Sequence, residues 1–166
     1  SVNERNKSHI LSLNVPYNPN SILIRLQQLN LRCLVDTGAE CCLINKRIYD
    51  NLKYRVPMKR SKLSLCSANG TEMKILGETM LDFKIAGIKM SHNFVVVSDF
   101  NRSIILGRDF LIKHGVRLYF DLGKMRIQNA YIPLENDIHI SSVSRITKTL
   151  VMKPQTVCLI NAKIKR

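Results

Sequence analysis

Residues 31–39 read Leu31-Arg32-Cys33-Leu34-Val35-Asp36-Thr37-Gly38-Ala39, an apolar strand that runs into an aspartate, a small hydroxyl residue, a glycine and an alanine. An isolated carboxylate at the end of such a strand is costly to bury. Thr37 can donate a hydrogen bond beside it, and Gly38 allows a backbone or a second carboxylate to come close. The same tripeptide also suits an ordinary strand-to-turn junction, so Asp36 acquires a function only if the rest of the chain supports one.

Two later stretches supply that support. The first runs from Leu63 to Ile75, where apolar residues alternate on both sides of Asn69-Gly70, a pair that favours a tight hairpin turn. The second is Ile104-Ile105-Leu106-Gly107-Arg108-Asp109-Phe110-Leu111, an apolar strand that ends in glycine and leads into a helix. Such a strand can pass close beside an active-site loop.

The remaining pattern predicts a mainly β fold. Alternation of apolar and polar residues indicates short strands at 22–26, 81–85, 116–120 and 125–127, and the apolar run at 94–97 indicates a buried strand. Two short helices are expected, one over 45–53 with Asn45 as its N-cap and one over 108–114 ending at Gly115. Beyond residue 127, the stretches 143–150 and 156–164 are candidate strands, either packed on the domain or part of a connector.

Taken in this order, the Asp36 triplet, the hairpin and the Gly107 strand resemble the retropepsins, the aspartic proteases of retroviruses and long-terminal-repeat retrotransposons. The chain looks most like the gypsy-type retrotransposon enzymes. The resemblance covers residues 21–127 and implies a retropepsin-type acid protease barrel with one short C-terminal helix and a flap hairpin. It leaves residues 1–20 as an N-terminal arm and 128–166 as a C-terminal extension or connector toward a following Pol domain. The start at Ser1 rather than Met favours a fragment of a longer polyprotein.

The resemblance also assigns roles to residues by position. It implies that Asp36 is the catalytic aspartate, supported by Thr37, Gly38 and Ala39, with Thr37 bonding across to a partner subunit. Leu106-Gly107 would buttress the catalytic loop. The residues expected to contact substrate are Glu40, Ala68, Asn69, Gly70, Ile105 and Arg108. Glu40 departs from the family pattern, because retroviral members often have Asp there.

Aspartic protease chemistry needs two carboxylates that share one proton and titrate as a coupled pair. The ionised member activates a water molecule, and the protonated member donates a hydrogen bond to the developing oxyanion. This chain offers one suitable aspartate, since Asp121-Leu122-Gly123 lacks the hydroxyl residue and suits a turn. We therefore expect a homodimer whose active site is shared between two copies of the chain, with no metal and no cofactor.

The composition excludes several other classes of protein. The chain has 166 residues, of which 45% are apolar, enough for a buried core and too many for general disorder. No apolar run approaches the about 18 residues of a membrane-spanning helix, so we expect no membrane association. The cysteines form no C-x-x-C pair, and their apolar surroundings indicate a reducing compartment, the cytoplasm or the interior of virus-like particles; they are Cys33, Cys41, Cys42, Cys66 and Cys158.

The charge leaves one alternative open. The chain carries a net charge of +14, with a local cluster at Lys53, Arg55, Lys59, Arg60 and Lys62. This cluster either contacts nucleic acid phosphates or is an ordinary solvated face. The leading hypothesis is an aspartic endopeptidase that cleaves a Gag-Pol-type polyprotein. Its rivals are a cellular retropepsin-like protease and a catalytically silent basic dimer that binds nucleic acid.

Overall fold

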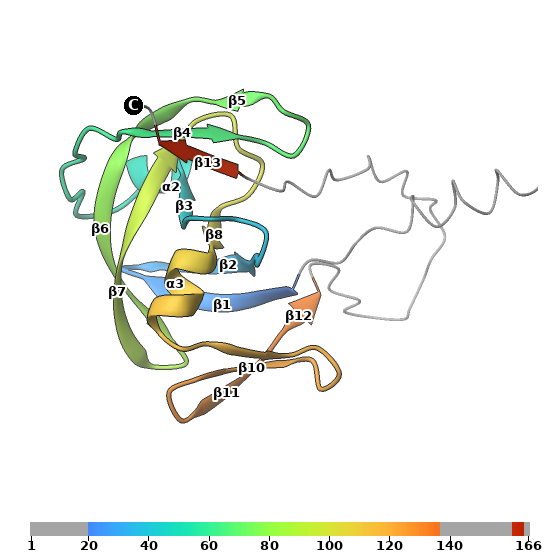
Figure 1. Ribbon diagram of the computed structural model, residues 1–166. Helices are drawn as coiled ribbons and strands as arrows, with labels where there is room; N and C mark the ends of the chain where they lie inside the picture. Colours follow the sequence, from blue (N-terminus) through green and yellow to red (C-terminus); the bar gives the residue numbers. More distant parts are fainter. Residues whose placement is uncertain (1–19, 137–160, 165–166) are drawn as a thin grey trace, which may run out of the picture.

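A closed barrel of six strands forms the centre of the computed structural model, which describes residues 20–136 and 161–164 (Figure 1). The strands lie in the order β1-β2-β8-β3-β7-β6, and the barrel closes because β1 also pairs with β6. Their bounds are β1 (Asn20–Leu26), β2 (Leu29–Val35), β3 (Leu43–Asn45), β6 (Ile75–Ile85), β7 (Ile88–Val97) and β8 (Ile104–Leu106). The predicted mainly β, retropepsin-type barrel is confirmed.

The longest hairpin of the barrel shows why these residues form strands. Along β6, Leu81, Phe83 and Ile85 are buried, and the residues between them point to solvent. The turn to β7 is made by Ala86 and Gly87, which have φ values of 48° and 80°. A two-residue turn with both φ values positive matches the twist of the strands it joins.

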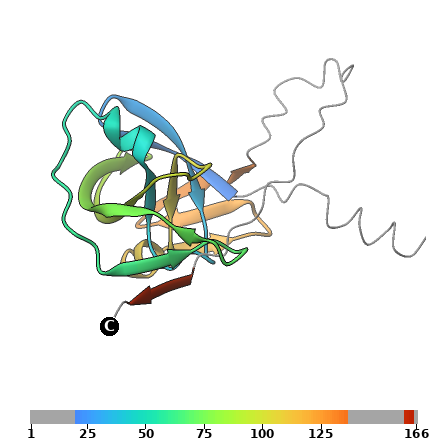
Figure 2. The same cartoon turned by 90° about the horizontal axis from the view of Figure 1, so that it is seen from above.

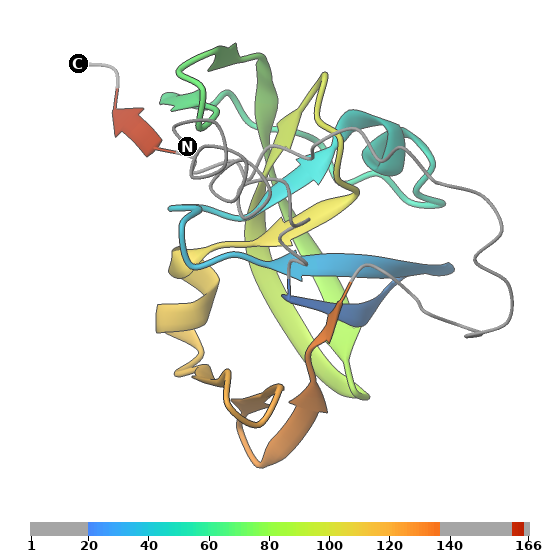
Figure 3. The ribbon, with the colours of Figure 1, turned by 90° about the vertical axis from the view of Figure 1, so that its right-hand side faces the viewer.

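Two smaller sheets lie at opposite ends of the barrel (Figure 3). One is the predicted hairpin, formed by β4 (Leu63–Cys66) and β5 (Glu72–Met73), with β13 (Asn161–Ile164) paired antiparallel to the outer edge of β4 (Figure 2). The other contains β9 (Arg117–Tyr119), β10 (Lys124–Ile127) and β11 (Ala130–Pro133).

The expected domain limit at residue 127 falls between two paired strands, β10 and β11. The folded part continues through β12 (Glu135–Asn136), which pairs with the start of β1. Of the candidate strands in the C-terminal extension, 143–150 lies outside the described residues and the end of 156–164 forms β13. The arm at 1–19 also lies outside the described residues.

Two short helices are present in the described ranges. Helix α2 (Lys46–Asp50) begins as predicted, because the side chain of Asn45 accepts a hydrogen bond from the Arg47 amide at 2.8 Å. It ends earlier than the predicted residue 53, with Asn51 as its C-cap. Helix α3 (Arg108–Lys113) ends before Gly115, which has a φ of 58°. Neither helix is long enough or apolar enough to span a membrane.

The core consists of two hydrophobic clusters. The larger one fills the barrel: Phe83 of β6 packs against Phe94 of β7 and Phe110 of α3, and the β9–β11 sheet contributes Met125, Ile127 and Ile132. The smaller one lies under the β4–β5 hairpin and contains Ala39, Leu43, Leu65, Val95, Val97, Phe100 and Ile105. This second cluster joins the hairpin to the loop after β2, so the two parts of the candidate site share one apolar base.

Candidate active site

The loop after β2 carries Asp36 and is shaped by backbone hydrogen bonds. Strand β2 runs parallel to β8, and the Asp36 amide donates to the Leu106 carbonyl at 3.0 Å. The Gly38 amide donates to Asp36 Oδ1 at 2.8 Å, and the Ala39 amide donates to the Asp36 carbonyl at 3.3 Å. These bonds turn the chain tightly around the carboxylate and set its direction.

The half-buried position of Asp36 changes its acidity. Loss of solvent raises the pKa of the carboxyl above its ordinary value. The hydrogen bonds from Gly38 and Ala39 and the positive charge of Arg102 act in the opposite direction but are outweighed. The carboxyl therefore holds its proton more readily than an exposed aspartate, which suits one member of a proton-sharing pair.

Gly107 brings β8 and α3 against this loop more closely than any side chain would allow. A Cβ atom at this position would lie 2.5 Å from the Cys41 carbonyl oxygen and 2.8 Å from that of Ala39. The residues that follow bind the loop as well: the Arg108 amide donates to the Ala39 carbonyl at 2.8 Å, and the Asp109 amide donates to the Glu40 carbonyl at 3.2 Å. The Gly107 segment thus lies beside the Asp36 loop, as its sequence indicates.

The three expected support residues have different surroundings. Thr37 is exposed, and its hydroxyl finds no hydrogen-bond partner in the part of the chain that the structure describes. Together with Arg108 and Leu111 it lines a surface pocket of about 540 Å³. Ala39 is 0% exposed: its side chain packs in the smaller core cluster and supports the loop from below. Gly38 contributes through its amide.

The hairpin tip contains Ala68, Asn69 and Gly70, all at the surface. Gly70 has a φ of 81°, a backbone conformation that residues with a Cβ atom adopt only with strain. The Asn69 side chain accepts from the Thr71 amide at 3.0 Å, and the Ser67 and Thr71 backbones pair across the turn at 2.8 Å. The tip is therefore a well-formed turn held away from the body of the protein.

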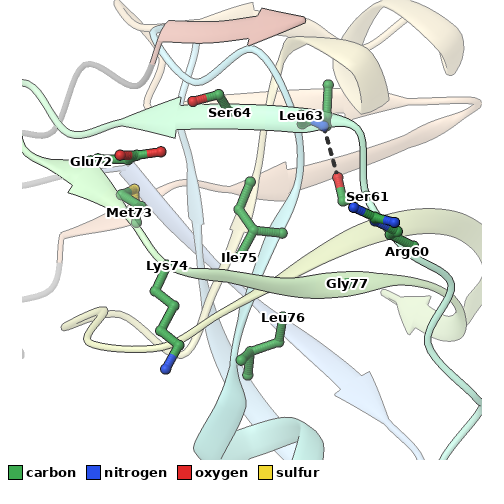
Figure 4. Close-up of a pocket in the computed structure, with 10 residues that line it drawn as sticks. All are labelled: Arg60, Ser61, Leu63, Ser64, Glu72, Met73, Lys74, Ile75, Leu76 and Gly77. Atoms are coloured by element: carbon green, nitrogen blue, oxygen red, sulfur yellow. Dashed lines mark hydrogen bonds between the residues drawn. The ribbon is translucent and has the colours of Figure 1, made fainter. Parts of the chain in front are cut away.

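A pocket of about 460 Å³ lies between the two strands of this hairpin and the start of β6 (Figure 4). Leu63, Met73 and Ile75 give it an apolar side, and they also pack against the smaller core cluster. Glu72 and Lys74 are charged residues of the same wall. This lining is suited to an extended chain with a mixture of apolar and polar side chains.

The other expected substrate contacts are divided by burial. Glu40 and Arg108 are exposed on either side of the Gly107 contact. Ile105 was expected to touch substrate, but it is 1% exposed and belongs to the smaller core cluster, together with Ala39 and Leu65. Its side chain belongs to the core because β8 is covered on both faces, so a peptide in the cleft has no access to it.

Sequence reasoning missed the most connected side chain near the loop, that of Asp109. Its Oδ2 accepts from His92 Nε2 at 3.0 Å and from the Cys42 amide at 3.3 Å. Its Oδ1 accepts from Cys42 Sγ at 3.2 Å and from the Phe110 amide at 2.7 Å. Burial raises the pKa of this carboxyl, but the hydrogen bonds from His92 and Cys42 outweigh that effect and hold its pKa below the ordinary value.

The side chains of Cys42, His92 and Asp109 are the one set among residues 20–136 and 161–164 that could hold a metal ion, since their ligand atoms lie within 4.8 Å of one another.

The cysteines Cys33, Cys41, Cys42 and Cys66 are free thiols. Burial raises the pKa of Cys41 to about 12 and also raises the pKa of Cys42. These two thiols therefore stay protonated and behave as small apolar groups.

The second aspartate considered in the sequence lies far from this chemistry. Asp121 is exposed in the turn between β9 and β10, where Gly123 donates its amide to the Phe120 carbonyl at 3.3 Å. The turn interpretation of Asp121-Leu122-Gly123 is therefore confirmed. Among the described residues, Asp36 is the aspartate at the centre of an Asp-Thr-Gly loop.

Comparisons with known proteins agree with this geometry. Residues 22–113 match the family described as gag-polyprotein putative aspartyl protease. The retroviral protease-like domain of Ddi1 from Leishmania major is similar in fold, with a TM-score of 0.60 and 21% identity over 70% of this chain and 96% of that one. EIAV protease complexed with the inhibitor HBY-793 is also similar, with a TM-score of 0.52 and 25% identity over 64% of this chain and 96% of that one. No curated protein matches the chain.

Proposed function

This chain belongs to the gag-polyprotein aspartyl protease family, and on that premise we propose that it is a homodimeric aspartic endopeptidase that cleaves a retroelement Gag-Pol polyprotein. The observation that carries the proposal is the Asp36 loop. It holds a half-buried carboxyl of raised pKa, and the chain has no second loop of this kind in its described part.

The proposed dimer follows from the need for a second catalytic carboxyl. One carboxyl cannot both activate a water molecule and protonate the scissile carbonyl, so a second Asp36 is needed across a two-fold axis. The exposed Thr37 hydroxyl, without a partner in the described part of its own chain, is placed to bond to the partner loop. The pocket that Thr37 shares with Arg108 offers that loop a surface to pack on.

The mechanism then proceeds by acid–base catalysis. The paired Asp36 carboxyls share one proton, and the ionised one takes a proton from a water molecule that attacks the peptide carbonyl. The protonated one donates a hydrogen bond to the oxyanion that forms, and the proton taken from the water then passes to the leaving amine as the C–N bond breaks. The β4–β5 hairpin covers the peptide, and the pocket below it accepts side chains from the substrate. Each subunit of the proposed dimer contributes the same residues to this mechanism.

The free thiols support a reducing location, so we place the enzyme in the cytoplasm or within virus-like particles. A cellular retropepsin-like protease is the second candidate, favoured by the fold similarity to the Leishmania major domain. That similarity, at 21% identity, concerns the fold and leaves the substrate open.

The experiment is to incubate the purified chain with candidate polyproteins and map the products by mass spectrometry, with Asp36→Asn as the matched control. Discrete cleavage between Gag-Pol domains by the wild type alone supports the proposal. Cleavage restricted to cellular proteins points to the second candidate. RNA binding without cleavage by either protein identifies the catalytically silent alternative.

A further inference from the structure

The Asp109 carboxylate joins three parts of the protein that are distant in sequence. It lies in the first turn of α3, it contacts Cys42 in the segment that follows the catalytic loop, and it contacts His92 on β7. Cys42 also accepts a hydrogen bond from the Gly107 amide on its sulfur at 3.3 Å. The segment from Asp36 to Cys42 is therefore held at its first residue by β8 and at its last residue by Asp109.

His92 is 5% exposed, and its Nδ1 atom is buried with no hydrogen-bond partner in the described part of the chain. An unpaired buried polar atom costs the folded protein stability. Phe94 and Phe110 surround the ring, so an apolar side chain would fill this site without that cost. The imidazole is useful here through its other nitrogen, which donates to Asp109 Oδ2 at 3.0 Å.

We propose that Asp109 and His92 are positioning residues of the active site: His92 orients the Asp109 carboxylate, and the carboxylate fixes Cys42 and so the loop that carries Asp36. This inference rests on the proposed protease function for its catalytic readout. The carboxylate meets its hydrogen-bonding needs entirely with the amides, thiol and imidazole already in place.

The test compares two substitutions at His92 with one at its neighbour. His92→Gln keeps an N–H donor near the position of Nε2, and His92→Leu removes it. His114→Leu is the matched control, because His114 lies in the same aromatic cluster, 5.9 Å from His92 between ring centres, and also has an unpaired buried nitrogen. Its side chain makes no hydrogen bond to Asp109 in the described structure.

We expect His92→Leu to lower kcat by about 10- to 100-fold, since a small displacement of a catalytic group has effects of this size. His92→Gln should recover most of kcat, and His114→Leu should leave it unchanged. Hydrogen exchange at the Gly38 and Ala39 amides should speed up in His92→Leu alone. This exchange is measurable even if no substrate is cleaved, so failure of the protease proposal and failure of the positioning proposal are separable.

Equal kcat in His92→Leu and His114→Leu, or no change in exchange at Gly38, would overturn the inference. Stoichiometric zinc in the purified wild-type protein that is lost in Cys42→Ala would also overturn it, because the three side chains would then be metal ligands rather than a hydrogen-bonded support.

Discussion

Gly107→Ala tests the idea that close packing of the end of β8 against the Asp36 loop sets the position of Asp36. The added Cβ would lie 2.5 Å from the Cys41 carbonyl oxygen, and ordinary contact begins at 3.4 Å, so one backbone segment has to move by about 0.9 Å (3.4 − 2.5). The atoms in the way belong to the backbone of Cys41 and Ala39, which no rotamer change can move aside.

The expected effect on catalysis is large. A displacement of this size at a catalytic group lowers kcat by about 100-fold, or about 2.7 kcal/mol of transition-state free energy. Overpacking should also lower the free energy of unfolding by about 1–3 kcal/mol. We would measure kcat on a fluorogenic peptide and the free energy of unfolding by urea denaturation, both at a protein concentration that keeps the proposed dimer saturated.

Gly87→Ala is the matched control, because it makes the same chemical change far from the loop. Gly87 has a φ of 80°, and a Cβ added there would have no atom within 4 Å, so alanine is strained by about 1–2 kcal/mol without a clash. It should lower stability and leave kcat unchanged. If Gly107→Ala and Gly87→Ala lose stability to a similar extent and both keep wild-type kcat, the reasoning about Gly107 is refuted.

Three further outcomes are expected. Excess Asp36→Asn chain mixed with wild type should inhibit peptide cleavage, because mixed dimers have one carboxyl; unaffected activity would mean that each chain acts alone. Burial raises the pKa of Asp36 in the folded protein above its value in the unfolded chain. The protonated carboxyl therefore contributes its full stability at a pH below the pKa of the unfolded chain, and this contribution is lost as the pH rises through the pKa of the folded protein. Asp36→Asn should therefore gain stability over wild type in urea denaturation as pH rises from acid to neutral, and a constant difference would contradict the shift. Amide exchange at residues 67–72 should slow when a transition-state peptide inhibitor binds, and equal exchange would show that the β4–β5 hairpin is only structural.

Local sequence patterns were sufficient to predict the main elements of the fold and the position of Asp36 at the end of a strand. Alternation of apolar residues predicts strands such as β6, and Asn69-Gly70 predicts a turn, because both depend on neighbours a few residues apart. The Asn45 cap predicts where α2 begins for the same reason. An aspartate followed by a hydroxyl residue and glycine at the end of a strand is likewise a local signal.

Only the tertiary structure decided the surroundings of these elements. Cys42 and Asp109 are 67 residues apart and His92 is 17 residues from Asp109, so no local pattern connects them. The alternation of a strand also does not say whether a second layer covers its other face, and for this reason Ile105 was expected in the cleft but lies in the core. Hydrogen bonds and burial between distant segments arise only when the barrel closes and brings those segments together.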